Sequence, residues 1–561
     1  MLLNKGFIGK LTGYLQRIFD EHFMFIMILF IINSLTTAWS LFDEDKIDVA
    51  IGYIFSVWLG SLIITCLIDL LPKRFLQKIV KAVLVIPIGL IFIGEFFTMY
   101  CYKALIGTGI INSALETNMR EATEFFSMYI GFSGVVSVIV LIALIVGLYK
   151  YNPLKKITLK QKTKSGIVCT LMVLSVFYTI RMFTVYTDFI WDDEVLPVQR
   201  VYASTSVAVR NMQAYRELSS QVNSKVELTE NKSEIKNIVF ILGESTSKGH
   251  MSLYGYPLET TPKMDKMAKN NEIYVFKDVI SPHAYTIGSL REVFTFHNYE
   301  ATNKWYECNN LFDIMRKAGY KTYWLSNQET SGQWANVALA YANRCDYKKF
   351  TGIRQSYEKS YRADGELLPL LYEAMNNNSE KNFYVLHLMG CHGEYENRYT
   401  PDFAKFSDVD ETKGIIKTQE AKTKRAQYDN AILYNDTIVT QVMEAFKDKE
   451  AIVIYMPDHG EEVYDLKNFN GHSDDNPTKS MLEIPFVIYT TEKFKQKYPL
   501  VDAQIRASVD KKYMTDDLIH TILDITGIKT PEFQETRSII NPYYNQERKR
   551  IFLDKDYDNW Q

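Results

Sequence analysis

Five apolar runs, each about 20 residues long, occupy most of the first 185 residues of this 561-residue chain. They cover approximately residues 23–42, 50–71, 79–101, 128–149 and 166–185. A helix of that length crosses the hydrocarbon core of a bilayer, so the pattern predicts five transmembrane helices. Buried helices of a soluble protein are the alternative, but five long runs in succession argue against it. No cleavable signal peptide is expected, because the first run is long, lacks a clear small-residue cleavage site and is followed by further runs.

Basic residues in the short loops predict the orientation of these helices. Lys5, Lys10 and Arg17 precede the first run, and the loops at 72–78 and 150–164 carry an excess of lysine and arginine. Loops of this composition stay in the cytoplasm. An odd number of spans then puts the N-terminus in the cytoplasm and everything after residue 185 outside it.

The rest of the chain has the composition of an exported soluble domain. The overall balance of 63 Lys and Arg against 66 Asp and Glu gives no indication of nucleic-acid binding. Residues 186–232 mix polar and apolar positions, which suits a connector with amphipathic helices near the membrane surface. From Asn237 apolar strands alternate with helical stretches, a pattern typical of a mostly parallel sheet covered on both faces. We therefore predict three parts, at 1–185, 186–232 and 233–561.

The six cysteines divide evenly between the two halves. Three lie in predicted spans, where they are expected to be small packing residues: Cys66, Cys101 and Cys169. The other three follow the spans and face an oxidising compartment: Cys308, Cys345 and Cys391. We expect a disulfide between Cys308 and Cys345, because an odd count leaves one thiol unpaired and Cys391 lies within a polar motif.

Chemically active side chains follow three of the predicted strands directly. Glu244 follows "NIVFILG", His387 and His392 lie in "NFYVLHLMGCHGEY", and Asp458 and His459 follow "AIVIYMP". A single "DHG" could equally be a structural loop or helix cap. Parallel strands that end at one edge of a sheet would instead bring two carboxylates and imidazoles together. Such mixed oxygen and nitrogen ligands suit Zn²⁺, with Mn²⁺ as the next choice.

Thr286 is the candidate nucleophile. It follows a short polar segment and precedes a helical pattern at 287–296. A threonine at that place could be a plain N-cap. The same helix N-terminus favours a phosphate group, and a bound Zn²⁺ would lower the pKa of the hydroxyl. The sequence leaves both interpretations open until the other motifs are added.

Together these motifs resemble the bacterial phosphoethanolamine transferases, in order and over nearly the whole chain. The matching stretches are "GEST", "YTIGSL", "HLMGCHGEY", "YDNAILYND", "PDHGEE" and "NGHS". The resemblance implies an inner-membrane enzyme with five spans and a periplasmic α/β/α domain of alkaline-phosphatase-like (sulfatase) fold. It also implies that membrane lipids surround the spans and that the enzyme is a monomer.

The resemblance assigns roles by position. It implies zinc ligation by Glu244, Thr286, Asp458 and His459. His392 and His472 would bind the substrate phosphate or protonate the leaving oxygen. Headgroup contacts are implied in "INSALETNMREA", at Asn112, Ser113, Thr117 and Glu121. His387 and Glu462 are further candidates for substrate binding.

The implied reaction has two steps. Thr286 attacks the phosphate of phosphatidylethanolamine, diacylglycerol leaves, and an acceptor then takes phosphoethanolamine from the threonine. The acceptor is expected to be a lipopolysaccharide or another periplasmic glycan. With its proline and aromatic residues around Thr286, the stretch "SPHAYTIGSLREVFTF" resembles the family members that act on core sugars or other periplasmic glycans more than those that act on lipid A.

Less specific interpretations remain for several residues. His387 could be a satisfied strand histidine, and Glu461 and Glu462 could be solvated loop charges. His283 and His297 flank the nucleophile segment but match no ligand position.

Three other functions are open to the same sequence. A phosphoglycerol transferase of the lipoteichoic-acid-synthase type would share the spans, the threonine and the metal site. A sulfatase would need Cys or Ser followed by x-Pro-x-Arg at the nucleophile, which is absent. A membrane-anchored sensor with a catalytically dead fold would not need all the matched positions.

Overall fold

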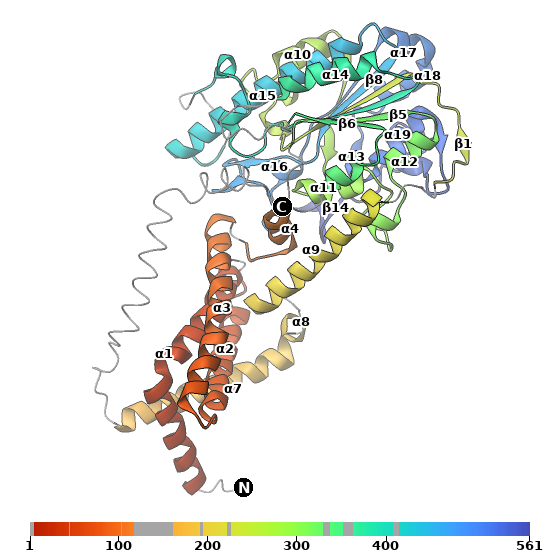
Figure 1. Ribbon diagram of the computed structural model, residues 1–561. Helices are drawn as coiled ribbons and strands as arrows, with labels where there is room; N and C mark the ends of the chain where they lie inside the picture. Colours follow the sequence, from red (N-terminus) through yellow and green to blue (C-terminus); the bar gives the residue numbers. More distant parts are fainter. Residues whose placement is uncertain are drawn as a thin grey trace. The chain divides into compact units, whose positions relative to one another are not determined.

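The structure is a computed structural model that describes most of the chain (Figure 1). The described residues are 5–43, 45–102, 104–116, 161–190, 195–220, 226–328, 337–351, 363–407 and 414–560. The chain divides into two compact units, one formed by residues 1–114 and 126–209 and the other by 115–125 and 210–561.

The first unit is helical. Among the described residues, four of its helices are long and apolar enough to cross a membrane. They are α1 (Lys5–Asp43), α2 (Ile47–Asp69), α3 (Arg74–Tyr102) and α7 (Gln161–Val185). Four of the five predicted apolar runs are therefore helices of membrane-spanning length, and the predicted span at 128–149 lies outside the described residues. The shorter helices are α4 (Thr108–Glu116), α8 (Thr187–Ile190) and α9 (Pro197–Ser220), the last of which continues into the second unit.

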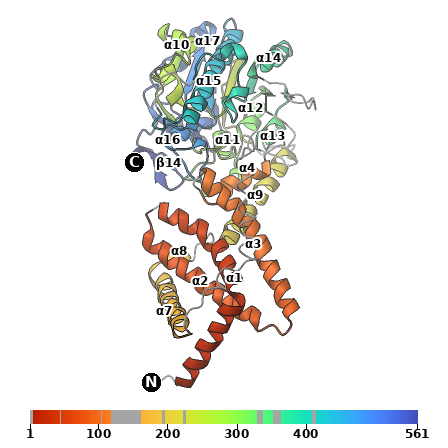
Figure 2. The ribbon, with the colours of Figure 1, turned by 90° about the vertical axis from the view of Figure 1, so that its left-hand side faces the viewer.

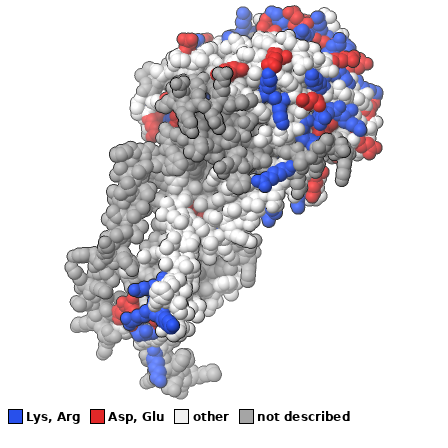
Figure 3. All heavy atoms as spheres, viewed as in Figure 1, with Lys and Arg blue, Asp and Glu red and all other residues white. Residues whose placement is uncertain are grey.

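The surface of these helices is apolar. Leu67, Val83, Leu90 and Val173 are each more than 60% exposed. Figure 3 shows the difference: charged side chains are scattered over the second unit, whereas the described helices of the first unit are uncharged over most of their length. Such a surface is stable against lipid rather than water.

A buried ion pair lies inside the helical unit. Arg200 of α9 donates to Glu95 of α3 from Nε (2.8 Å) and from Nη2 (2.9 Å). The hydroxyls of Thr36 and Thr37 on α1 complete the group. A buried pair overcomes its desolvation only when its remaining donors and acceptors are satisfied, as they are here. The start of α9 is thereby fixed to α1 and α3.

The second unit contains a mainly parallel sheet. Seven strands of the described residues form it, in the order β3-β11-β8-β2-β7-β5-β6. Their bounds are β3 (Ile273–Phe276), β11 (Phe486–Thr490), β8 (Ala451–Pro457), β2 (Asn237–Gly243), β7 (Asn382–His387), β5 (Lys321–Ser326) and β6 (Tyr347–Phe350). Only the pairings of β11 are antiparallel. The prediction of a mostly parallel sheet is confirmed.

Both faces of the sheet are covered by helices. Along β2, Ile238 and Phe240 face one hydrophobic core, and Val239 and Ile241 face the other, as strand alternation requires. One core is closed by α11 (Thr286–Val293), α12 (Leu311–Lys317), α13 (Val337–Ala342) and α19 (Leu518–Thr526). The opposite core is closed by α10 (Pro262–Lys269), α14 (Leu367–Asn376) and α15 (Gln419–Phe446). Figures 1 and 2 show these two layers from perpendicular directions.

Smaller elements complete the unit. Four two-stranded sheets pair β1 (Glu230–Asn231) with β13 (Ile528–Lys529), β4 (Asp278–Ile280) with β12 (Lys512–Met514), β9 (Glu462–Val463) with β10 (Asn470–Gly471) and β14 (Ile551–Phe552) with β15 (Lys555–Asp556), among the residues described. The remaining α-helices are α16 (Lys479–Leu482), α17 (Glu492–Lys497) and α18 (Pro499–Arg506).

The predicted disulfide between Cys308 and Cys345 is wrong. Both residues are free thiols. The Cys345 sulfur lies 3.6 Å from the carbonyl oxygen of Tyr341, its own helix neighbour, and the Cys308 sulfur lies 3.2 Å from Asn303. Each thiol thus contacts a residue close to it in the sequence rather than the other cysteine. Counting cysteines could not reveal this, because pairing depends on Cα separation and side-chain direction.

A buried charge cluster joins the loop after β2 to α15. His250 lies 2.7 Å from Asp429 through Nδ1 and 2.7 Å from Asp465 through Nε2. Burial alone would lower the pKa of His250, but the attraction of Asp465 and Asp429 outweighs it and raises this pKa to about 10. The imidazole is therefore a cation held between two carboxylates.

We expect the stability that His250 contributes to depend on pH. Its pKa is higher in the folded state than the usual 6.5, so the contribution is full below pH 6.5 and is lost as pH rises to about 10. Thermal unfolding of the wild type and of His250→Gln should show the largest gap in Tm near pH 6. That gap should narrow by several degrees by pH 9.5. A gap that stays constant between these pH values would contradict the assignment.

Candidate active site

The chemically active side chains lie at one edge of the sheet, where β8, β2 and β7 end side by side. Gly243 of β2 pairs with Pro457 of β8, and Leu242 pairs with His387 of β7. Glu244 and Asp458 are the next residues after the paired ends. The parallel register thus brings together residues that are more than 200 positions apart in the sequence, as the strand-end pattern predicts.

Glu244, Asp458 and His459 form a compact, fully buried group. One ligand atom of each lies within 4.8 Å of the others. His459 Nδ1 lies 2.7 Å from the carbonyl oxygen of Gly460, an acceptor only, so Nδ1 carries a proton and Nε2 is the nitrogen that faces Glu244 (3.4 Å) and Asp458 (3.5 Å). Asp458 Oδ1 accepts from the amides of Ser245 and His459, whereas Oδ2 is buried without a hydrogen-bond partner among the described residues. An orphaned carboxylate oxygen beside an imidazole nitrogen fits a divalent metal ion.

The electrostatics of the group also favour a cation. Burial and the charge of Glu244 raise the pKa of Asp458 to about 7. Burial would raise the pKa of Glu244 too, but hydrogen bonding and attraction from His459 lower it well below its usual value. For His459, burial is outweighed by Asp458 and Glu244, and its pKa rises to about 10, so a proton on its imidazole supplies the positive charge that a metal ion bound at Nε2 would supply in its place. Two buried carboxylates thus require positive charge between them.

Thr286 begins α11 and points its hydroxyl at this group. Its Oγ lies 3.4 Å from both carboxylate oxygens of Glu244 and 3.3 Å from His459 Nε2. The residue before it, Tyr285, is the N-cap, with extended backbone and no side-chain cap. The N-cap interpretation of Thr286 is therefore wrong, and its hydroxyl faces the cluster at the positive end of a helix.

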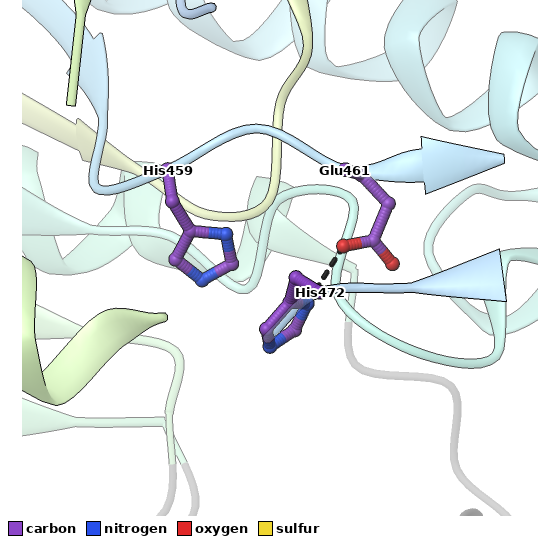
Figure 4. Close-up of side chains that lie close together, drawn as sticks. All are labelled: His459, Glu461 and His472. Carbon is purple, nitrogen blue, oxygen red and sulfur yellow. Dashed lines mark hydrogen bonds and ion pairs between the residues drawn. The ribbon is translucent and has the colours of Figure 1, made fainter. Parts of the chain in front are cut away.

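Two further histidines line the same site. His472 lies with its ring 4.2 Å from that of His459 and 5.8 Å from that of His392. Its Nδ1 lies 2.7 Å from Glu461 Oε2, as Figure 4 shows, which leaves Nε2 available. The Nδ1 of His392 is buried without a partner among the described side chains, and burial lowers the pKa of His392 to about 4.

His387 lies deeper, as the last residue of β7. Its Nδ1 is 3.2 Å from the hydroxyl of Ser326, while its Nε2 has no partner in the described part of the chain. Only one of the two ring nitrogens of His387 therefore has a hydrogen-bond partner among the described residues. Sequence reasoning missed its neighbour Gln328, whose Nε2 donates to Glu244 Oε2 (3.0 Å) and to the carbonyl of Leu388 (3.1 Å).

Glu461 and Glu462 are both buried, so their interpretation as solvated loop charges is wrong. Glu461 accepts from the hydroxyl of Tyr395 (2.7 Å) as well as facing His472. Glu462 Oε1 accepts from the backbone amides of Asp465 (2.5 Å), Leu466 (2.7 Å) and Lys467 (3.4 Å), and Oε2 accepts from Thr478 (2.7 Å). The carboxylate of Glu462 thus uses its hydrogen bonds on the loop that follows it in the chain and on Thr478.

The remaining candidates lie elsewhere or outside the described residues. Asn112 and Ser113 belong to α4, whereas Thr117 and Glu121 are not among the described residues. His283 lies 2.6 Å from Asp474, which also accepts from the amide of Ala284 (2.6 Å).

Asp474 therefore links the segment before Thr286 to the loop of His472. The signal for Asp474 in the sequence was its position two residues after that histidine.

A second acidic group, outside this site, could mimic a metal site. Glu21, His22 and Asp69 lie close together in the helical unit. Two cations already serve it: Arg17 lies 2.5 Å from Asp69, and Lys81 lies 2.9 Å from His22. This group is balanced without a metal ion.

Comparisons with known proteins agree with the site. A family model described as phosphoethanolamine transferase EptA/EptB matches residues 61–212, and the sulfatase family model matches residues 236–528. Phosphoethanolamine transferase EptC of Escherichia coli K12 is 30% identical over 506 residues, which cover 86% of this chain and 85% of that protein.

Two solved structures are similar. The C-terminal periplasmic domain of EptC from E. coli, in complex with Zn, has a TM-score of 0.55 at 32% identity and covers 58% of this chain and 93% of its own. The integral membrane lipooligosaccharide phosphoethanolamine transferase A of Neisseria meningitidis has a TM-score of 0.63 at 20% identity. The match covers 92% of this chain and 97% of that protein. The predicted sulfatase-like fold of the soluble part is confirmed.

We expect Zn²⁺ to stabilise the metal-free protein through the Glu244 group. At a zinc concentration 100-fold above Kd, binding to the folded state adds about 2.7 kcal/mol, which should raise Tm by several degrees. Asp458→Asn should abolish this rise. The matched control is Asp69→Asn, which alters the second acidic group and should keep it. If only Asp69→Asn lost the rise in Tm, the metal would bind at the second acidic group, in the helical unit, and the assignment to Glu244, Asp458 and His459 would be wrong.

Proposed function

The chain belongs to the phosphoethanolamine transferase family, and we propose that it transfers phosphoethanolamine from phosphatidylethanolamine to lipopolysaccharide through a phosphorylated Thr286. The observation that carries this mechanism is the position of the Thr286 hydroxyl, 3.3–3.4 Å from Glu244 and His459. A hydroxyl at a helix N-terminus, beside a group built for a cation, suits nucleophilic attack on a phosphate.

We propose that zinc is the metal and that Glu244, Thr286, Asp458 and His459 hold it. Support comes from the unpartnered Oδ2 of Asp458, from the Nε2 of His459, which faces the two carboxylates, and from the zinc complex of the EptC domain. When bound, Zn²⁺ lowers the pKa of a hydroxyl and offsets the charge of phosphoryl oxygens. Mn²⁺ is the second choice for the same ligands.

In the first step the Thr286 hydroxyl loses its proton to a base and its oxygen forms a bond to phosphorus, while the bond between phosphorus and the diacylglycerol oxygen breaks. The departing oxygen needs a proton. His392 and His472 are the proposed phosphate-binding and proton-donating groups, because both rings face the same site. Since burial lowers the pKa of His392 and keeps its imidazole neutral, we propose phosphate binding for His392 and proton donation for His472. Glu461 would orient His472 through its Nδ1. In the second step an acceptor oxygen attacks the phosphorus, and the Thr286 oxygen is released.

A lipid donor accounts for the apolar helices. We propose that the chain is anchored in a bacterial inner membrane, with a cytoplasmic N-terminus, a fifth span at 128–149 and a periplasmic catalytic part. We further propose the limits 1–185, 186–232 and 233–561 for the membrane part, the connector and the catalytic part. The sulfatase match at 236–528 supports the start of the catalytic part, whereas the other match, 61–212, extends past residue 185.

The remaining assignments are also proposals. Contacts to the donor headgroup are proposed for Asn112, Ser113, Thr117, Glu121 and His387. Glu462, which sequence reasoning assigned to substrate binding, is better explained as a residue that shapes its own loop. The protein is proposed to act as a monomer.

We propose a lipopolysaccharide core sugar as acceptor, rather than lipid A or another periplasmic glycan. The support is the sequence around the nucleophile, where proline and aromatic residues precede Thr286. In the structure this segment is closely packed: the rings of His283 and Tyr285 pack edge to face at 5.6 Å, and a Cβ on Gly288 would meet the His283 ring at 2.5 Å.

Incubation of the detergent-solubilised protein with phosphatidylethanolamine should add one phosphoethanolamine to Thr286, measured by intact-protein mass spectrometry. Thr286→Ala should form no adduct, because it removes the hydroxyl that is proposed to attack the phosphate. Thr286→Ser is the matched control and should retain some adduct, since it keeps the hydroxyl.

Parallel incubations separate the other functions. An adduct from phosphatidylglycerol alone would mean a phosphoglycerol transferase. A protein that binds no metal and forms no adduct with either lipid would be a sensor with a dead fold.

A further inference from the structure

The turn that follows Glu244 has an unusual backbone. Ser245 adopts a positive φ of 50°, a left-handed conformation that residues other than glycine rarely take. Such a conformation persists only where the surroundings hold it, and it concentrates at functional sites. The turn therefore needs an external constraint.

Ser245 connects both carboxylates of the proposed metal site. Its hydroxyl donates to Glu244 Oε1 (2.8 Å), and its amide donates to Asp458 Oδ1 (3.3 Å). The separation of the two carboxylates therefore depends on the conformation of this one residue.

A buried tyrosine of α15 holds the turn. The Tyr428 hydroxyl donates to the carbonyl oxygen of Ser245 (2.7 Å) and accepts from the amide of Ser247 (2.9 Å). Its ring is fully buried and packs edge to face on His250 (4.9 Å) and on Tyr395 (4.9 Å). The hydroxyl can therefore leave the turn only if the surrounding core moves.

We propose that Tyr428 is a positioning residue: its hydroxyl keeps Ser245 in the left-handed conformation and thereby sets the distance between the Glu244 and Asp458 carboxylates for the metal ion. This inference rests on the proposed function, because it concerns the same metal. Tyr428 does not touch the substrate or the reacting atoms. It acts through the backbone of Ser245, as outer residues around metal sites commonly act on the ligands.

The test is the zinc affinity of the full-length, detergent-solubilised protein after removal of metal. Tyr428→Phe keeps the ring and removes only the hydroxyl, so we expect zinc to bind about tenfold more weakly or worse. Excess zinc should restore phosphoenzyme formation in this variant. Tyr341→Phe is the matched control, because the Tyr341 hydroxyl is buried without a partner among the described residues, and its zinc affinity should equal the wild type.

A second pair of variants tests the backbone directly and does not require Tyr428→Phe to fold. Ser245→Gly and Ser245→Ala both lack the hydroxyl that donates to Glu244. Only glycine adopts a positive φ without strain, so Ser245→Gly should bind zinc more tightly than Ser245→Ala. Equal affinities in this pair, or equal affinities of Tyr428→Phe and the wild type, would overturn the inference while leaving the proposed function intact. A wild type that binds no zinc would overturn both.

Discussion

Two buried carboxylates that meet at the ends of β2 and β8 set the chemistry of this protein. Glu244 and Asp458 are both at most 2% exposed, so their mutual repulsion is not screened by water. Positive charge between them stabilises the arrangement, and the neighbouring groups supply it or leave room for it. His459 directs its Nε2 inward, and Thr286 adds a hydroxyl at the positive end of α11. The carboxylates thus create a binding site for a cation, and the hydroxyl of the nucleophile lies next to that site.

The surrounding structure holds this repulsive pair in place. The loop after β2 is fixed by Tyr428 and by the ion group of His250, both of which involve α15. The loop after β8 is fixed by backbone hydrogen bonds: the amide of Gly460 donates to the carbonyl oxygen of Met481 (2.7 Å), and the carbonyl oxygen of His459 accepts from the amide of Thr246 (3.0 Å). The site and its supports all come from one rigid sheet and the helices on it. Such a scaffold fits catalysis that depends on preorganised charge.

Much of the site could be predicted from the sequence because strand ends are visible there. A buried strand reads as an apolar run, and parallel strands must end at a common edge, so Glu244, Asp458 and His459 could be grouped without coordinates. Hydrogen-bond partners could not be found in this way. Gln328, Glu461 and Tyr428 are ordinary polar residues in sequence, and their roles depend on contacts across 84, 11 and 183 positions.

The sequence by itself determined the apolar helices, the alternation of strands and helices and the identity of the chemical groups, because these depend on hydrophobic period and on motifs local to the chain. Tertiary structure alone decided that Cys308 and Cys345 do not form a disulfide, which glutamates are buried and which residue caps α11. Cys308 and Cys345 remain apart, Glu462 turns into its own loop, and Tyr285 rather than Thr286 takes the cap. The physical reason is that burial, side-chain direction and hydrogen-bond geometry arise only when distant segments pack together.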